Sequence, residues 1–386
     1  MKSQGKKVLV GVSGGVDSSV ALALLKKQGY DVTGVFLKVW HPEWLPCDWK
    51  EERRSAMRVC ATLGVPFMTL DCEKEYKKEV VDYMIAEYRA GRTPNPDVFC
   101  NKYVKFGVFL KKALDLGVDF VATGHYARVD SGFKSQDSRI INQHHSCIMN
   151  HESCFNLLEG KDKNKDQSYF LYTLDQDQLS HTLFPIGDLT KPEVRKLAKK
   201  FGLSTATKKD SQGVCFLENL DIKDFLSHYI KTKKGDVLKT NGEVIGFHDG
   251  AILYTIGERH GFTITKKSPN DPRYFVVAKD LEKNTITVAN KESESEAVFS
   301  TKEVVIKDLH LISPTPGVWE TSRRVSEKFS VRIRYRQEKQ KCSIEKESDG
   351  WHILFNEPQN GVAPGQSAVL YDNDVCLGGG VIDAVQ

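Results

Sequence analysis

A glycine-rich turn between an apolar run and a helix-forming stretch constrains this chain more than any other feature. Residues 8–18 read VLVGVSGGVDS, and no Lys-Ser or Lys-Thr pair follows the glycines, so the loop is not of the Walker A type. Gly14 and Gly15 permit a tight turn whose amide N–H groups face an anion. We expect Asp17 or a neighbouring serine to cap the following helix, whose N-terminus favours negative charge. The segment predicts a phosphate-binding loop. The alternative is a glycine turn in an ordinary strand–helix unit.

The first 125 residues alternate short apolar runs with helical patterns. Strands are predicted at residues 7–12, 31–39, 67–71 and 119–123, and Gly29 ends the first helical pattern. This alternation predicts an α/β domain whose mostly parallel sheet is covered by helices on both faces. Ligands of such sheets bind at the carboxyl ends of the strands. Residues 13–18, Leu37 and Gly124 fall at those ends and are expected to converge on one nucleotide.

The rest of the sequence predicts two smaller domains. Residues 131–156 are polar and show no clear period, Thr190 and Glu193 form a predicted capping box, and a short helix is predicted at 221–230. Asn241 and Gly242 indicate a hairpin, and beyond about residue 300 short strands alternate with turns. We expect a nucleotide-binding domain at 1–218, a small linking domain at 219–295 and a C-terminal β-barrel at 296–386.

Composition limits the partners and the compartment. The 55 basic and 51 acidic residues give a net charge of only +4, so an RNA partner would need local basic patches. No apolar run is long enough to cross a bilayer, and the N-terminus lacks the apolar region of a signal peptide. The nine cysteines, an odd number, do not resemble a secreted disulfide framework. We expect a soluble cytoplasmic protein with no membrane partner.

Two loops carry cysteines in an unusual setting. Residues 91–101 read GRTPNPDVFCN, in which two prolines stiffen a loop that presents Asn95, Asp97 and Cys100 together. Residues 208–216 read KKDSQGVCF, in which nearby lysines favour the thiolate of Cys215. A lone cysteine is more often a small core residue. That ordinary role is expected for Cys60, Cys72, Cys342 and Cys376.

These loops carry a family resemblance. The loop at residues 13–18 is similar to that of the ATP pyrophosphatases, the PP-loop group, which transfer AMP to an oxygen. The chain as a whole resembles the tRNA-specific 2-thiouridylase family, which makes 2-thiouridine at the wobble uridine. The matching segments are residues 11–18, 86–101, 122–128, 164–171, 209–216, 334–337 and 376–380.

The resemblance implies roles for individual residues. Asn95, Pro96 and Asp97 would meet the target base, and Cys100 would be the nucleophile paired with a persulfide-carrying Cys215. ATP, as a substrate, would contact Gly11, Val12, Ser13, Gly14, Gly15, Val16, Asp17, Ser18, Leu37 and Gly124. The residues that would contact tRNA are Lys165, Asp166, Gln167, Arg334 and Tyr335. The implied partners are the wobble-uridine tRNAs for Lys, Glu and Gln and a persulfide donor, such as a cysteine desulfurase or a sulfur carrier protein.

The implied chemistry needs both loops. The C2 oxygen of uracil is a poor leaving group, and transfer of AMP to it, with Mg²⁺ screening the phosphates, makes it a good one. A persulfide on Cys215 then supplies sulfur. Cys100 either frees hydrosulfide from that persulfide or resolves a Cys215–S–S–base adduct into a Cys100–Cys215 disulfide, and the sequence leaves both routes open. Asp97 is expected to act as general acid or base, with an Asx turn as the alternative.

Two other functions fit parts of the pattern. One is a different enzyme with the same loop, such as a tRNA 4-thiolation enzyme or an amidating ATP pyrophosphatase. The other is a tRNA-binding protein without thiolation activity. Asn95 and Asp97 argue against amidation, and the intact Cys100 and Cys215 argue against a loss of thiolation.

Three smaller features complete the expectations. A His/Cys cluster fits no familiar zinc spacing, so no tightly bound metal is expected; its members are His144, His145, Cys147, His151 and Cys154. His125 is expected either to hold its loop or to touch substrate. Alternation puts Arg332, Arg334 and Arg336 on one strand face, either solvated or facing phosphates. The resemblance places Arg334 and Tyr335 together at the tRNA, which would require a strand end or bulge there.

Overall fold

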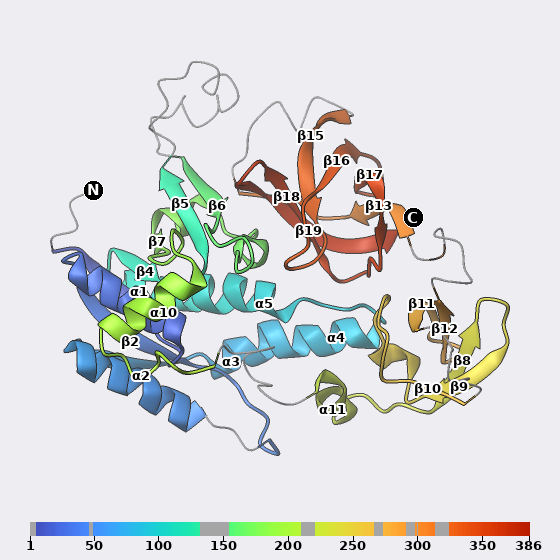
Figure 1. Cartoon of the computed structure of the whole chain (residues 1–386), viewed down its shortest axis with the longest axis horizontal. Helices are drawn as coiled ribbons and strands as arrows, with labels where there is room; N and C mark the ends of the chain where they lie inside the picture. Colours follow the sequence, from blue (N-terminus) through green and yellow to red (C-terminus); the bar gives the residue numbers. More distant parts are fainter. Residues whose placement is uncertain are drawn as a thin grey trace.

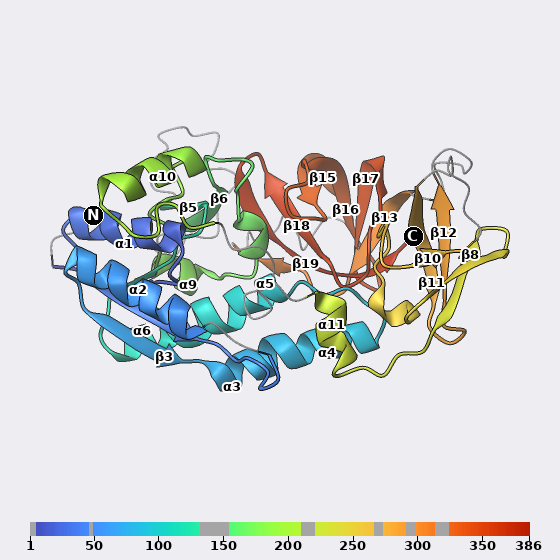
Figure 2. The ribbon, with the colours of Figure 1, turned by 60° about the horizontal axis from the view of Figure 1, so that its bottom comes forward.

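The computed structural model describes three packed parts of the chain, an α/β domain, a small sheet domain and a β-barrel (Figure 1). The described residues are 5–45, 49–131, 154–209, 221–265, 273–290, 298, 300–312 and 324–386. The α/β domain and the small sheet lie at opposite ends of the molecule, and the barrel lies between them (Figure 2). No helix among the described residues is long and apolar enough to cross a membrane.

The α/β domain contains a five-stranded parallel sheet of order β3-β2-β1-β4-β7. Its strands are β1 (Lys7–Gly11), β2 (Asp31–Lys38), β3 (Phe67–Asp71), β4 (Phe120–Ala122) and β7 (Thr182–Leu183). The four strands predicted from the sequence are confirmed within two residues at each end. The direction of the strand order reverses between β1 and β4, which is the place where such sheets bind ligands.

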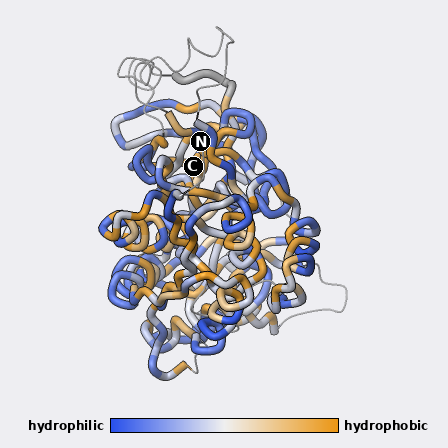
Figure 3. Tube along the Cα trace, turned by 90° about the vertical axis from the view of Figure 1, so that its left-hand side faces the viewer, coloured by the Kyte–Doolittle hydropathy of each residue, from blue (hydrophilic) through white to orange (hydrophobic). Residues whose placement is uncertain are grey.

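Helices cover both faces of this sheet because consecutive residues of β1 point to opposite sides. Val8 and Val10 pack with α1 (Val16–Lys27), α2 (Trp49–Leu63) and α10 (Lys191–Lys200). Leu9 instead packs with residues of a second helical layer, which contains α5 (Pro96–Phe99), η2 (Cys100–Phe109) and α6 (Leu110–Asp115). The helices alternate hydrophilic and hydrophobic residues along the trace (Figure 3), as expected for helices with one packed face.

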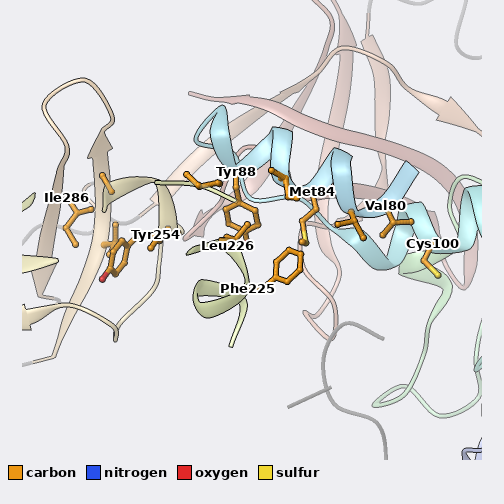
Figure 4. Close-up of a cluster of buried hydrophobic side chains, with 14 of the residues drawn as sticks. Val80, Met84, Tyr88, Cys100, Phe225, Leu226, Tyr254 and Ile286 are labelled. Carbon is orange, nitrogen blue, oxygen red and sulfur yellow. The ribbon is translucent and has the colours of Figure 1, made fainter. Parts of the chain in front are cut away.

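The small domain packs on a long, continuous helix of the α/β domain, whose middle segment is π-helical. That helix consists of α3 (Glu73–Tyr76), η1 (Lys77–Asp82) and α4 (Tyr83–Arg89). Figure 4 shows Val80, Met84 and Tyr88 on this helix near Phe225 and Leu226 of α11 (Ile222–Ser227). The small sheet has the order β10-β9-β8-β12-β11. Its strands are β8 (Gly235–Lys239), β9 (Val244–His248), β10 (Thr263–Ile264), β11 (Tyr274–Asp280) and β12 (Thr285–Asn290).

Six strands close the C-terminal barrel, because β13 pairs with both β17 and β19. They are β13 (Ser300–Ile306), β15 (Arg324–Arg332), β16 (Gln340–Lys346), β17 (Trp351–Asn360), β18 (Ser367–Asp372) and β19 (Val375–Val385). The hairpin of β5 (Ala127–Ser131) and β6 (Phe155–Glu159) extends the barrel sheet, with Leu158 paired to Val375 of β19. This hairpin lies within the first domain, so one sheet runs from the first domain into the barrel, separate from the parallel sheet. The sequence did not predict this connection.

Candidate functional site

The phosphate-type loop is formed as predicted, except at its helix cap. Gly15 is the N-cap of α1, and no side chain caps this helix, so the prediction that Asp17 or a serine caps it was wrong. The reason is that Asp17 has other partners, while the hydroxyls of Ser18 and Ser19 donate to the Gly15 carbonyl, at 3.3 and 2.7 Å. The amide groups at the start of α1 are consequently free of side-chain caps and suit an anion.

Close backbone packing shapes this loop. Gly14 has φ of +77°, and a Cβ there would lie 2.6 Å from the Glu52 carbonyl oxygen. A Cβ at Gly124, which follows β4, would lie 2.5 Å from the Ser18 amide nitrogen. Glycine is thus required at both positions, and the Gly124 backbone lies directly against the first turn of α1. Leu37 lies near the end of β2 and is partly buried against two core clusters.

Two lysines that the sequence analysis missed border this loop. Lys191, the first residue of α10, places its Nζ 2.8 Å from both carboxylate oxygens of Asp17. The Tyr126 hydroxyl donates to Asp17 Oδ1 at 2.8 Å. Lys208 is exposed, and its Nζ donates to the Gly14 carbonyl at 3.2 Å. The capping box at Thr190 fixed the start of α10, but no sequence pattern indicated where the lysine beside it points.

The loop at residues 91–97 is held by all three parts of the molecule. The Thr93 amide donates to the Pro364 carbonyl of the barrel at 2.8 Å, and Gln366 Nε2 donates to the Thr93 carbonyl at 2.8 Å. The Thr93 hydroxyl lies 2.9 Å from that of Thr255 in the small domain. The shape of this loop therefore depends on the closed arrangement of the three parts.

The residues assigned to the target base lie just beyond this clamp. Asn95 is 9% exposed and precedes α5, and its side chain lowers the pKa of the neighbouring Tyr169 hydroxyl, which burial raises. Pro96 is the first residue of α5. Burial raises the pKa of the Asp97 carboxyl, and nearby Lys105 opposes that rise. No described group hydrogen-bonds to the Asp97 carboxylate, so the Asx-turn alternative is not what holds it here.

Cys100 is a buried cysteine outside any disulfide, at the start of η2. It lies at one end of the apolar cluster that joins the α/β domain to the small domain (Figure 4). Cys215 lies outside the described residues, as do His144, His145, Cys147 and His151. The four cysteines expected in the core are indeed buried: Cys60, Cys72, Cys342 and Cys376.

Arg334 and Tyr335 follow the end of a strand, which removes the conflict in their predicted directions. Strand β15 ends at Arg332, so the prediction of one strand face through Arg332, Arg334 and Arg336 was wrong. Arg332 instead turns inward and is 7% exposed. Arg334 Nη2 donates to the Asn360 carbonyl at 3.1 Å, and the Tyr335 ring lies 4.5 Å from that of Phe170.

The residues at 165–167 differ in their surroundings. Asp166 is buried and accepts hydrogen bonds from the amides of Gly160 and Ser168, at 2.9 and 3.2 Å, and from Arg332. Gln167 is partly buried, and its Oε1 accepts from the Tyr126 amide at 3.0 Å. Lys165 is partly exposed on the same turn. In this arrangement Asp166 faces Arg332 of the barrel, and Lys165 and Gln167 are both partly exposed.

Several of these segments converge. Asn101 Nδ2 donates to the Phe170 carbonyl at 3.0 Å, and the Tyr169 hydroxyl donates to the Ser367 carbonyl at 2.9 Å. Lys105 lowers the pKa of Asp97 and also that of His125, which burial has already lowered well below its usual range. His125 is the neighbour of Gly124, and its Nδ1 lies 2.7 Å from the Thr123 hydroxyl. Because Gly124 packs against the first turn of α1, His125 lies next to the phosphate loop, and the charge of Lys105 acts on both His125 and Asp97.

A group with metal-ligand chemistry is also present among the described residues, on the barrel. Glu347, Asp349 and His352 offer ligand atoms within 4.8 Å of one another. His352 Nε2 lies 2.8 Å from Asp349, and Nδ1 contacts Glu303. These carboxylates raise the pKa of His352 to about 9, so that a protonated imidazole occupies the centre of the group.

Comparison with known families agrees with this arrangement along the whole chain. Residues 6–219 match the family model described as the tRNA methyl transferase HUP domain. Residues 223–290 match the tRNA methyl transferase PRC-barrel domain, and residues 301–382 match the aminomethyltransferase beta-barrel domain.

Curated relatives match over nearly their full length. The chain is 43% identical over 386 residues to the tRNA-specific 2-thiouridylase MnmA of Francisella philomiragia, covering 98% of this chain and 99% of the relative. It is 44% identical over 384 residues to the protein of the same name from Halalkalibacterium halodurans, covering 98% and 95%. The matched length includes the phosphate loop and the segment 91–101 that contains Cys100, here called the cysteine loop. The chain belongs to the tRNA-specific 2-thiouridylase family.

Proposed function

We propose that this protein transfers sulfur to C2 of the wobble uridine of tRNA, using ATP to activate the C2 oxygen. The observation that carries the proposal is the joining of two loops in one domain. The phosphate loop lies at the switch point of the sheet, and the rigid loop with Asn95, Asp97 and Cys100 is clamped beside the barrel. A tRNA bound across the barrel would thus meet ATP and a thiol within one protein.

The phosphate loop would hold ATP for the first step. The residues proposed to contact ATP are Gly11, Val12, Ser13, Gly14, Gly15, Val16, Asp17, Ser18, Leu37 and Gly124. The close packing at Gly14 and Gly124 supports this role because it leaves main-chain amides to face phosphates. The Asp17 carboxylate is an oxygen ligand of the type that Mg²⁺ prefers, and Mg²⁺ would screen phosphate charge.

The two cysteines would carry the second step. A persulfide on Cys215 supplies sulfur, and Cys100 attacks its S–S bond or resolves an adduct with the base. Either route leaves a Cys100–Cys215 disulfide, which a reductant must open before the next turnover. Cys100 begins η2, directly after the short helix α5 that follows the barrel-anchored loop at residues 91–97, and this nearness to the residues assigned to the target base supports its role.

Base and tRNA contacts would come from the segments that converge around Tyr169. Asn95, Pro96 and Asp97 are proposed to contact the base, with Asp97 as general acid or base. Its raised pKa supports proton transfer closer to neutral pH than an ordinary aspartate allows. Lys165, Gln167, Arg334 and Tyr335 are proposed to contact tRNA. Asp166 is proposed to contribute indirectly. Its bond to Arg332 would hold the turn that carries Lys165 and Gln167 against the barrel.

The cellular setting follows from this function. We propose a cytoplasmic protein that acts on the wobble-uridine tRNAs for Lys, Glu and Gln. Its sulfur donor would be a persulfide carrier, such as a cysteine desulfurase or a sulfur carrier protein. The three domains would act as units with the boundaries expected from the sequence, 1–218, 219–295 and 296–386.

A division of labour between the loops tests the proposal. Cys215→Ser should still transfer AMP from labelled ATP to purified tRNA but should introduce no sulfur, because AMP transfer needs only the phosphate loop. Asp17→Asn should abolish both steps. Mass spectrometry of the tRNA nucleosides shows whether sulfur was introduced and at which ring position. Sulfur at C4, or loss of AMP transfer in a folded Cys215→Ser protein, would contradict this function.

A further inference from the structure

Lys191 is the more buried of the two lysines beside the phosphate loop, and the proposed function gives it no task. Its Nζ lies 2.8 Å from both Asp17 oxygens, and its side chain is only 12% exposed. The Tyr126 ring lies 5.9 Å from the ammonium group. A cation is therefore held beside the loop that the proposed function assigns to ATP phosphates.

The backbone of Lys191 is fixed independently of this ion pair. Thr190 and Glu193 form a capping box at the start of α10, and Pro192 follows in the first turn. The Lys191 amide donates to Asp162 Oδ2 at 2.9 Å. The helix start that carries Lys191 is therefore positioned without the help of Asp17, and the side chain can reach the phosphate loop from this fixed backbone.

The charges around the loop change when a nucleotide binds. Asp17 is the only acidic residue within the loop at residues 13–18, and Lys191 neutralises it in this structure. If Mg²⁺ were bound with the phosphates, the Asp17 carboxylate would be a suitable oxygen ligand for it and would then be less available to Lys191. The ammonium of Lys191 would then be released toward the phosphates, with the helix N-terminus of α1 beside it.

We propose that Lys191 binds the β-phosphate of ATP and stabilises the pyrophosphate that leaves. This inference rests on the proposed function. In the step it serves, a bond forms between uracil O2 and the α-phosphorus, and the bond from that phosphorus to the bridging oxygen breaks. The electron pair leaves with pyrophosphate, and the N3 proton of uracil passes to Asp97. Lys191 keeps its own proton and stabilises the negative charge that develops on the leaving group.

Pyrophosphate binding tests this role without any turnover. Asp17→Asn removes the carboxylate that Lys191 contacts and keeps the lysine, whereas the double variant Asp17→Asn/Lys191→Met removes both charges. Titration calorimetry without Mg²⁺ measures the affinity of both variants for pyrophosphate. We expect the Asp17→Asn protein to bind pyrophosphate on the order of tenfold more tightly than the double variant. Equal affinities would overturn the inference and make Lys191 a structural partner of Asp17.

Turnover gives a second, independent reading. Lys191→Met should lower the rate constant of AMP transfer on the order of a hundredfold and leave tRNA affinity unchanged. Lys191→Arg should recover part of this loss because it keeps the positive charge. Lys196→Met, an exposed lysine of the same helix, is the matched control and should behave as wild type. A Lys191→Met protein that only melts at a lower temperature, with AMP transfer intact, would also overturn the inference.

The failure of this inference differs from a failure of the proposed function. If the wild-type protein binds neither ATP nor pyrophosphate, the phosphate loop does not have its proposed role. If the wild type binds both and the two Asp17 variants bind pyrophosphate equally, only the role of Lys191 is wrong.

Discussion

The phosphate loop and the cysteine loop are built in different ways. Residues 13–18 are shaped by neighbours within the α/β domain, namely β1, α1, α2 and the turn after β4. Residues 91–97 take their shape from Thr255 in the small domain and from Pro364 and Gln366 in the barrel. If the proposed roles hold, ATP binding needs one domain, whereas presentation of the residues proposed to contact the base needs the whole assembled chain.

Gly124→Ala provides the strongest test of the first half of this comparison. Its Cβ would lie 2.5 Å from the Ser18 amide nitrogen, and backbone there has no room to yield. We expect ATP affinity to fall by about 2–3 kcal/mol, measured by titration calorimetry, with tRNA affinity unchanged. Gly15→Ala should cause a smaller loss, since its Cβ would meet only the Ser13 hydroxyl at 3.4 Å. Equal losses would show that packing at Gly124 does not shape the loop.

Gly365→Ala tests the second half of this comparison, the dependence of residues 91–97 on the barrel. Gly365 has φ of +92°, and a Cβ there would lie 2.7 Å from the Thr93 amide nitrogen. The displaced loop should slow sulfur transfer by about 1–2 kcal/mol in activation free energy while ATP affinity stays the same. Gly242→Ala, also at positive φ but with open space around it, controls for backbone strain alone. A parallel loss of ATP affinity in Gly365→Ala would mean that the two loops are not independent.

Arg334→Ala tests whether the barrel loop meets a phosphate. Loss of this contact should weaken tRNA binding by roughly 1–2 kcal/mol and flatten the salt dependence by about one unit, with ATP affinity unchanged. Binding isotherms at several salt concentrations measure both quantities. Lys346→Ala, exposed on the β16–β17 hairpin, is the control. An unchanged affinity across the salt series would assign Arg334 to bonding the Asn360 carbonyl alone.

His352 should give the smallest effect, and one confined to the barrel. Its pKa is raised from 6.5 to about 9 by Glu303 and Asp349, with Glu347 nearby. Because this pKa is higher in the folded than in the unfolded protein, protonated His352 adds to the free energy of unfolding. That contribution is complete below pH 6.5 and is lost as the pH rises toward 9. The melting temperature should fall by roughly 1–3 °C across that interval, and His352→Gln should remove this pH dependence. A variant with the same pH profile as the wild type would disprove the assignment.

Local patterns in the sequence predicted the elements that depend on neighbouring residues. The parallel strands, the capping box at Thr190 and the hairpin at Asn241 and Gly242 were all predicted correctly. The direction of the Arg332 side chain was not predicted correctly. The alternation of residues along a strand does not show that Arg332 forms buried ion pairs with Glu159 and Asp166. The same limit applies to Lys191, whose partner Asp17 is distant in sequence. Such pairings depend on tertiary packing, which periodicity does not encode.

The sheet shared by the β5–β6 hairpin and the barrel has a consequence for the nascent chain. Strand β6 pairs with β19, which follows it by roughly 200 residues. At about 5–20 residues per second, ribosomal synthesis would leave that edge of β6 exposed for roughly 10–40 s before its partner emerges. An open strand edge is a template for pairing with other chains, so expression of the first domain without the barrel would favour aggregation.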